Sequence, residues 1–261
     1  MLSFFVAAAT AVFVYMTAVF LIALIIKDNS IVDVAWGPGF ILVAAVTFLL
    51  RPGFEARRVL VCLFVVIWGL RLWAHVFLRN RGRGEDFRYA KWRRDWGRWF
   101  VPRSYFQVFL LQGIFMLVIS SPLVLVNGSS IRGLTALDGL GAVLWLVGFI
   151  FEAVGDYQLK KFKQKPESRG KIMTTGLWKT TRHPNYFGEA TLWWGIFLIG
   201  LSVPGGWAGI ISPLTIGFLL VKVSGIPMLE RKYAGNEEFL AYARRTSPFF
   251  PWFPKKTQKN S

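Results

Sequence analysis

Long, mainly apolar stretches are the dominant pattern of the chain and predict membrane-spanning helices. A helix needs about 20 apolar residues to cross roughly 30 Å of hydrocarbon. Seven stretches approach this length: Leu2–Ile26, Val34–Leu50, Val59–Leu78, Tyr105–Val126, Leu137–Gly155, Tyr186–Leu201 and Trp207–Val223. The sequence therefore predicts an all-α integral membrane protein with about seven transmembrane helices. Two stretches are short and two contain a proline, so counts of six or eight stay open.

The positive charges are distributed unevenly among the connections between these stretches. The chain has 31 Lys and Arg residues against 14 Asp and Glu residues, a net charge of +17. Of the 31 cations, 26 lie in the odd-numbered connections and the tail, and four lie in the even-numbered connections. The positive-inside rule then places the N-terminus outside and the C-terminus in the cytoplasm. The basic excess reflects topology and some attraction to anionic lipid rather than a nucleic-acid partner.

Cysteine and histidine are too scarce for several kinds of site. A single cysteine, Cys62, excludes a disulfide within the chain, and two histidines give little support for a metal centre. The chain has no long linker, so we expect one membrane domain over residues 1–261, acting as a monomer, with 222–261 as a cytoplasmic amphipathic segment. We expect Leu2–Ile26 to be retained rather than cleaved, because it lacks the features of a signal peptide. In a prokaryote, the inner membrane would be its location.

The sequence GLWKTTRHPNYFGE at 176–189 stands before the sixth apolar stretch. A proline suits the first turn of a helix, so Pro184 predicts a helix start directly after His183. On that helix Asn185 and Glu189 are four residues apart and share one face. A carboxylate carried into a membrane helix usually marks a functional site. The alternative is a plain helix start with basic residues at the lipid surface.

Asp33 lies just before Gly37-Pro38-Gly39, at the boundary of the second stretch. One interpretation is a protonated carboxyl group in apolar surroundings, able to donate a hydrogen bond or a proton. The other is structural: Ser30 caps a helix and Asp33 occupies its first turn.

Two basic stretches follow the third apolar stretch. Asn80–Arg83 places Arg81 and Arg83 beside glycines, and guanidinium groups suit phosphate oxygens. Lys91–Arg103 alternates tryptophan with arginine, a pattern typical of an amphipathic segment in the lipid headgroups. We interpret Asn80–Arg83 as a ligand site and Lys91–Arg103 as a membrane-surface segment.

Two further polar stretches lie near the predicted cytoplasmic side. Glu152, Asp156 and Lys163 fall on about the same stripe of the fifth helix, where simple ion pairing is the alternative to a site. Glu230–Tyr233 is predicted to begin an amphipathic helix that ends before Pro248 and acts either as a lid or as a surface anchor.

The four polar stretches together suit a nucleotide-type cofactor that enters from the cytoplasm, with an apolar substrate arriving from the lipid. The cations, including Arg81 and Arg231, would face phosphates, whereas carboxylates and amides would face ribose or base, and His183 is a further candidate cofactor contact. Neither a G-x-G-x-x-G fingerprint after a strand nor a phosphate loop occurs, so no soluble nucleotide-binding fold is indicated.

The motifs WxxxRHPNYFGE and ERKY resemble the superfamily that joins steroid 5α-reductases and enoyl reductases with isoprenylcysteine carboxyl methyltransferases. The N-terminal features IVDVAWGPG and NRGRGED look more like the steroid 5α-reductase branch, in particular its bacterial homologues. This resemblance implies a seven-helix membrane enzyme that binds NADPH and reduces the carbon–carbon double bond of an enone such as a 3-oxo-Δ4 steroid.

The resemblance also implies roles for individual residues. Asp33 falls near a glutamate that polarises the carbonyl group of the substrate, and Trp68 stands in place of a tyrosine that helps to hold the carbonyl oxygen. Glu152 stands where the family has an asparagine, and Lys163 where it has an arginine. The matching cofactor positions are Asn80, Arg83, Asp156, Asn185, Glu189 and Tyr233.

Two other functions stay open from the sequence. An S-adenosylmethionine-dependent methyltransferase acting on a lipid-like substrate would use the RHPNY and ERKY elements equally well. A lipid-binding or transport protein is a third class, although its charges should line a path open to both sides. The N-terminal arginine cluster favours a cofactor with several phosphates over a sulfonium cofactor.

Overall fold

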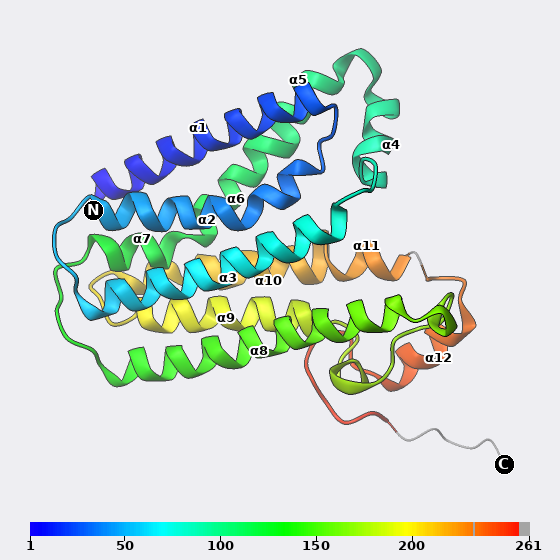
Figure 1. The fold of residues 1–261 in the computed structure, drawn as a ribbon. Helices are drawn as coiled ribbons and strands as arrows, with labels where there is room; N and C mark the ends of the chain where they lie inside the picture. Colours follow the sequence, from blue (N-terminus) through cyan, green and yellow to red (C-terminus); the bar gives the residue numbers. More distant parts are fainter. Residues whose placement is uncertain (232, 256–261) are drawn as a thin grey trace. The chain divides into compact units, whose positions relative to one another are not determined.

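The computed structural model describes residues 1–231 and 233–255, so Lys232 and the last six residues of the tail lie outside the described part. Helices dominate this part of the chain (Figure 1). The α-helices are α1 (Leu2–Ile26), α2 (Ile31–Leu49), α3 (Ala56–Asn80), α4 (Phe87–Trp96), α5 (Phe100–Ser104), α6 (Leu111–Ile119), α7 (Ser121–Gly128), α8 (Ala136–Gln164), α9 (Pro184–Gly200), α10 (Ile211–Phe218), α11 (Ile226–Arg231) and α12 (Glu237–Arg245). Within the described residues, extended pairing is limited to one bridge between Thr181 and Ser247.

Six helical segments are long and apolar enough to cross a membrane, which confirms the predicted all-α membrane class. They are Leu2–Ile26, Ile31–Leu49, Ala56–Asn80, Phe87–Ile119, Ala136–Gln164 and Gly206–Arg231. The sixth predicted stretch forms α9, but the 17 residues of this helix extend only about 26 Å at 1.5 Å per residue. The helix expected there is present, and its length falls short of the roughly 30 Å hydrocarbon layer.

Three helix boundaries differ from those predicted. The helical segment that contains the fourth predicted stretch begins earlier than expected, at Phe87. It passes through a π-helical turn, Tyr105–Leu110, and is interrupted before α7. The fifth predicted helix corresponds to α8. It continues beyond the apolar run to Gln164, so the charged residues that follow the run are also helical. The tail does not form one helix: α11 ends at Arg231, and Asn236 caps the separate helix α12 through the amide N–H of Phe239.

The contacts within the chain group it into two compact units. Unit 1 comprises residues 1–138 and 199–212, and unit 2 comprises residues 139–198 and 213–261. Each is described by itself below. Whether they act as the single domain expected from the sequence stays a prediction.

In unit 1, α2 packs directly on α3 through two glycines. A Cβ atom added to Gly37 would lie 2.3 Å from the carbonyl oxygen of Gly69, so no larger residue fits without movement of the backbone. Pro38 lies inside α2 without ending it, as prolines can in membrane helices. This close contact buries Phe40 and Trp68 completely, and their rings meet edge to face at 5.3 Å.

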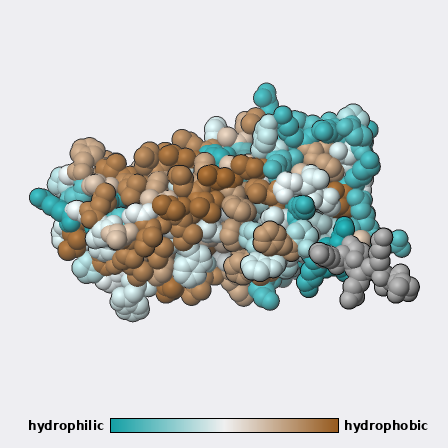
Figure 2. Space-filling view, turned by 90° about the horizontal axis from the view of Figure 1, so that it is seen from below, coloured by the Kyte–Doolittle hydropathy of each residue, from teal (hydrophilic) through white to brown (hydrophobic). Residues whose placement is uncertain are grey.

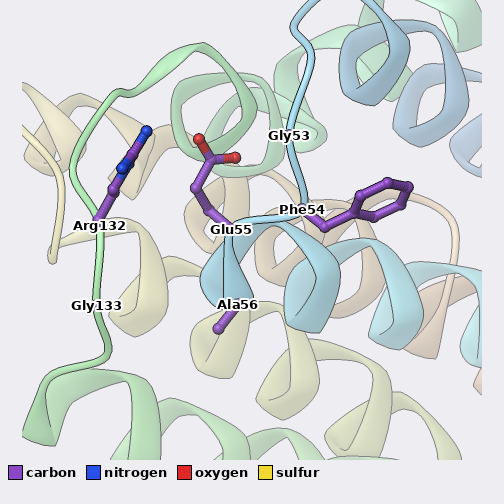
Figure 3. A pocket seen from close by; sticks show the side chains of 6 residues that line it. All are labelled: Gly53, Phe54, Glu55, Ala56, Arg132 and Gly133. Atoms are coloured by element: carbon purple, nitrogen blue, oxygen red, sulfur yellow. The ribbon is translucent and has the colours of Figure 1, made fainter.

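The loops at the far end of α2 are fixed by buried arginines. Arg57 is 2% exposed and pairs with Asp138 at 2.7 Å, and Arg58 pairs with Glu55 at 2.6 Å. Beside them is an open depression of about 340 Å³, where Figure 3 shows the side chains of Glu55 and Arg132. Because α2 is 19 residues long, this depression lies about 28 Å from the start of that helix.

Large apolar side chains cover the outer surface of the spanning helices. For example, Ile25 on α1 is 80% exposed, and Ile114 on α6 is 58% exposed. Figure 2 shows hydrophobic atoms over much of the face in view. An exposed apolar surface of this extent indicates contact with lipid.

Unit 2 is built on a contact between α8 and α9 in which glycines face backbone. A Cβ atom at Gly188 would lie 2.4 Å from the amide nitrogen of Glu152, and one at Gly148 would lie 2.5 Å from the amide nitrogen of Leu192. A Cβ atom added to Gly195 would likewise collide with the backbone of α8. Small residues let membrane helices approach this closely, and van der Waals packing then stabilises the pair.

Replacing Gly188 by alanine should therefore destabilise unit 2. The added methyl group collides with backbone rather than with a flexible side chain, and overpacking of this kind costs about 1–3 kcal/mol. We expect Gly188→Ala to lower the apparent melting temperature of the purified protein by several degrees. Gly139→Ala is the matched control, because Gly139 has nothing within 4 Å of its added Cβ atom, and this variant should melt at the wild-type temperature or slightly above it. Equal melting temperatures for both variants would contradict the close contact.

Candidate functional site

The close contact of α8 and α9 brings Asp156 and Asn185 together. A Cβ atom on Gly155 would lie 3.2 Å from the amide nitrogen of Asn185, so the first turn of α9 lies against α8 at this level. One residue further along, the side-chain amide of Asn185 donates a hydrogen bond of 3.0 Å to Asp156 Oδ1. Asp156 is 8% exposed, so this polar pair stands at a largely enclosed position.

Two polar atoms of the RHPN motif are buried without a hydrogen-bond partner. They are Asn185 Oδ1 and His183 Nδ1. A buried polar group without a partner costs about 1–3 kcal/mol, and such groups are uncommon in folded proteins. One N–H of the Asn185 amide is used by Asp156, and its oxygen is an acceptor that no protein donor fills among the described residues.

His183 is held from its other ring nitrogen. His183 Nε2 lies 3.0 Å from Glu230 Oε1, and its ring stacks on Tyr186 with centroids 5.5 Å apart. Glu230 also accepts two hydrogen bonds from Arg182, at 2.8 and 3.1 Å. The carboxylate of the ERKY motif thus clamps both residues of the Arg-His pair, and a bidentate arginine pair of this kind is strong and directional.

Arg182 extends the clamp to the C-terminal tail. Its Nη1 donates to the carbonyl oxygens of Ala243 at 2.9 Å and Thr246 at 2.8 Å, at the end of α12. Tyr242 on α12 is 4% exposed and donates to the carbonyl oxygen of Trp178, and burial raises the pKa of its phenol above the ordinary value. The tail therefore closes on the 176–183 loop.

The two predicted cofactor residues that follow Glu230 differ in their surroundings. Arg231 is exposed at the end of α11, whereas the ring of Tyr233 stacks on Phe239 with centroids 5.4 Å apart. The cationic side chain is thus accessible to an anionic ligand, and the tyrosine is held by packing.

Glu230→Gln should loosen the tail, because it leaves the Arg182 guanidinium without its anionic partner. Breaking a buried ion pair by removing one partner costs about 3–5 kcal/mol, and the 24% exposure of Glu230 places the expected cost below that range. We expect faster amide hydrogen exchange over 237–246 and earlier proteolytic cleavage of the tail. Glu237→Gln, at an exposed carboxylate of α12, should leave both rates near those of the wild type. Unchanged exchange in Glu230→Gln would show that the clamp does not hold the tail.

In unit 1, Asp33 lies in the first turn of α2 and is fully engaged by α4. Asp33 Oδ2 accepts from Arg88 at 2.6 Å, and Asp33 Oδ1 accepts from the hydroxyl of Tyr89 at 2.9 Å. Both carboxylate oxygens of Asp33 are therefore occupied as acceptors. Of the two interpretations that the sequence left open, the structure shows Asp33 in the first helical turn, and its role as a proton donor stays a prediction.

The loop before α4 is fixed to the corner between α1 and α2. The amide N–H of Asn29 donates to Glu85 at 2.9 Å, and Arg93 binds both oxygens of Glu85 at 2.7 and 2.9 Å. Ser30 does stand at the N-cap position of α2, but its hydroxyl accepts from the amide of Asp86 at 2.7 Å instead of capping the helix. Ser30 is thus part of this lock.

The Glu85 lock should weaken in acid. Burial acts to raise the pKa of Glu85, but the hydrogen bonds from Arg93 and Asn29 outweigh it and hold this pKa below the ordinary 4.5. A carboxyl whose folded-state pKa is depressed stabilises the fold above its unfolded pKa, and this stabilisation is lost as the pH falls through the folded value.

We therefore expect the amide of Asn29 to keep its protection from hydrogen exchange between pH 7 and pH 5, after correction for the intrinsic rate, and to lose it below about pH 4. Glu85→Gln should give a weaker protection with little dependence on pH in that range. Loss of protection already at pH 6 in the wild type would contradict the lock.

The arginines of the 80–84 segment are accessible. Arg81 and Arg83 are both exposed, and Asn80 accepts from Arg79 at 3.2 Å. Gly82 has φ of +76° and open space around it. Exposed guanidinium groups on an open loop can bind an anion without first breaking an internal ion pair.

Trp68 is a core residue of unit 1. It is 0% exposed, and an edge-to-face series of rings connects it through Phe40 to Trp36, one turn after Asp33. Its predicted role at a substrate carbonyl stays a prediction.

The remaining predicted residues lie on α8 and α9. Glu152 is 2% exposed, Glu189 is half-buried and Lys163 is exposed. Together with Asp156, His183 and Asn185, these residues belong to unit 2, whereas Asp33, Trp68 and the 80–83 segment belong to unit 1. Among the described residues, no group of three or more His, Cys, Asp or Glu side chains is placed to hold a metal ion.

Sequence reasoning missed Arg88, Tyr89 and the clamp between Arg182 and Glu230. Arg88 and Tyr89 follow the Asn80–Arg83 segment in the run NRGRGEDFRY, but nothing in that run indicates that they pair with Asp33. The only signal for the clamp is that Arg182 and Glu230 have opposite charges, and the two residues are 48 positions apart in the sequence.

Comparison with known proteins places this chain in a family. A model of the family DUF1295, described as a protein family of unknown function, matches residues 19–246. The chain therefore belongs to the DUF1295 family and is an integral membrane protein of steroid 5α-reductase-like type.

The individual relatives are distant. An uncharacterised protein of Schizosaccharomyces pombe is 26% identical over 202 residues, 67% of this chain and 58% of that protein. Bovine 3-oxo-5-alpha-steroid 4-dehydrogenase 1 is 35% identical over 68 residues, 26% of each chain. A probable O-methyltransferase of Ustilaginoidea virens is 40% identical over 53 residues, 20% of this chain and 18% of that protein. The chain thus matches less than two thirds of each of these relatives, and no solved structure matches it.

Proposed function

We propose that this protein is a membrane oxidoreductase that uses NADPH to reduce the carbon–carbon double bond of an apolar enone, most simply a 3-oxo-Δ4 steroid. The observation that carries the proposal is the buried, unpartnered Asn185 Oδ1 beside Asp156, in a motif typical of this superfamily. The partial similarity to 3-oxo-5-alpha-steroid 4-dehydrogenase 1 supports the same reaction class.

The residues of unit 2 fit a coenzyme with amide, hydroxyl and amine groups. Asn185 Oδ1 can accept one hydrogen bond, and His183 Nδ1 can accept or donate one, according to its tautomer. Arg231 offers an exposed cation for a phosphate group. We propose that these residues hold NADPH from the cytoplasmic side.

The bound coenzyme would supply a hydride for the β-carbon of the enone, and a proton then completes the α-carbon. The protein must stabilise the negative charge that develops on the carbonyl oxygen. In the proposal, the Asp33 cluster supplies this stabilisation. Both oxygens of Asp33 already accept hydrogen bonds, so Asp33 donates only when protonated, and the N–H groups of Arg88 that Asp33 does not use are the other donors of this cluster.

An apolar groove in unit 1 suits entry of such a substrate from the lipid. It has a volume of about 270 Å³ between α1 and the π-helical turn with α6, and Phe13 and Ile114 at its edge are more than half exposed. Its lining residues are Ala9, Val12, Phe13, Met16, Leu110, Gly113, Ile114 and Leu117. A flat apolar molecule would bury its surface there without displacing charged groups.

The activity test is NADPH oxidation by the purified protein in the presence of a 3-oxo-Δ4 steroid, with the reduced product identified by mass spectrometry. Asp33→Asn should lower kcat by about 100-fold or more while changing the Kd for NADPH by less than threefold, since removal of a charge-stabilising group costs about 10²–10³ in rate. Tyr89→Phe removes the hydrogen bond that holds Asp33 Oδ1, and it should lower kcat less than Asp33→Asn does, because Arg88 still holds the carboxylate. Full activity of Asp33→Asn would remove Asp33 from the mechanism.

The alternative is a methyltransferase that uses S-adenosylmethionine, favoured by the partial similarity to a probable O-methyltransferase. Ligands that bind only the folded protein raise its melting temperature by mass action. We expect NADPH to raise it by several degrees in the wild type and by much less in Asn185→Ala, with S-adenosylmethionine giving no rise. Lys179→Ala, at an exposed cation of the same loop, is the control and should respond as the wild type does. A rise with S-adenosylmethionine alone would support the alternative instead.

A further inference from the structure

The α4–α5 segment of unit 1 has two sets of cations with different surroundings. Arg88 and Arg93 face the protein, where each binds carboxylates of the α1–α2 corner or the preceding loop. The other set is exposed and consists of Lys91, Arg94, Arg98 and Arg103. Within the described residues, none of these four cations has a carboxylate partner.

The inward contacts fix the orientation of the exposed set. Tyr89 is 2% exposed and Phe100 is 5% exposed, so the inner face of the segment is packed as firmly as a core helix. The guanidinium of Arg93 lies 4.1 Å from the ring centroid of Phe100, which ties α4 to α5. The segment therefore cannot rotate to shield its exposed cations.

Aromatic rings lie among the exposed cations. The rings of Trp92 and Trp96 stack 5.3 Å apart, the guanidinium of Arg103 lies 6.0 Å from the Trp96 ring, and Arg98 lies 5.7 Å from Trp99. Trp99 itself is 55% exposed. Tryptophan prefers the boundary between hydrocarbon and water, where its ring is apolar and its N–H is hydrated.

The segment also lies where headgroups would be. Figure 1 shows α4 at the end of unit 1 where α1 ends and α2 begins, and it runs across the direction of the spanning helices of that unit. A helix in this position presents its outer face to the membrane surface rather than to the hydrocarbon.

We propose that the face formed by Lys91, Arg94, Arg98 and Arg103 binds the headgroups of anionic phospholipids. Four cations against the single carboxylate of Asp95 give this face a net charge of about +3, and no internal ion pair must break before a phosphate binds. Each cation near an anionic membrane surface contributes on the order of 1 kcal/mol, about a fivefold change in binding. A soluble anion would gain from the charge but not from the exposed Trp99.

The test uses the full-length protein in mixed micelles without added dinucleotide, titrated with phosphatidylglycerol or phosphatidylcholine and analysed by native mass spectrometry. We expect the wild type to retain phosphatidylglycerol over phosphatidylcholine, and Arg94→Gln/Arg98→Gln/Arg103→Gln to retain at least about tenfold less. The control, Arg169→Gln/Arg244→Gln/Arg245→Gln, removes three exposed arginines elsewhere and should bind as the wild type does. The variant Arg94→Lys/Arg98→Lys/Arg103→Lys keeps the three positive charges and should bind phosphatidylglycerol as the wild type does.

Three results would overturn the proposal. Equal loss in the control would mean that net charge alone attracts the lipid, and undiminished retention in the Arg→Gln variant would mean that this face is not the site. Competition by inorganic phosphate at millimolar concentration would assign the face to a soluble anion instead. Equal melting temperatures of all variants in phosphatidylcholine provide the check on folding.

Discussion

The contact between α8 and α9 determines the arrangement of unit 2. Glycine at 148, 188 and 195 leaves no Cβ atom between the two backbones, and any larger residue at 188 would meet the amide of Glu152. Because the two helices are in direct contact, the side chains of Asp156 and Asn185 are close enough to form a hydrogen bond. That hydrogen bond uses one N–H of the Asn185 amide, while the amide oxygen is buried without a partner.

The remainder of the candidate site in unit 2 is held by charge rather than by close packing. Glu230 gathers Arg182 and His183, and Arg182 in turn binds the carbonyl oxygens at the end of α12. In unit 1 the same principle applies at a second place, where Asp33 and Glu85 each bind an arginine of α4. In each unit, helix packing places the backbone and a few carboxylates then fix the loops and short helices.

The sequence predicted the helices better than the contacts between them. Leu2–Ile26 forms as a helix with the expected bounds, because a mainly apolar stretch of 25 residues without a charge must satisfy its backbone groups internally when it lies in lipid. The start of α9 at Pro184 follows from the fixed φ of proline. The role of Arg88 could not be predicted, because 55 residues separate it from Asp33 and only the packed fold brings them together.

Asp33 shows how tertiary context changes the chemistry of a residue. In the sequence, a lone carboxylate before an apolar stretch suggests a protonated acid, but the cations available to it lie in a distant segment. The observed ion pair favours the carboxylate as an acceptor that orients Arg88 and Tyr89. The unpartnered atoms of Asn185 and His183 likewise follow from the fold, since only the structure shows which atoms of a polar motif are already in use.

The central claim is that unit 2 presents Asn185 Oδ1 to a phosphorylated dinucleotide. The most direct measurement is the mass of the small molecule released when the purified protein is denatured. We predict that the wild type releases NADP(H) in up to stoichiometric amounts and that Asn185→Ala, although folded, releases little. Release of S-adenosylmethionine or its demethylated product, or equal release of NADP(H) by both proteins, would contradict the account.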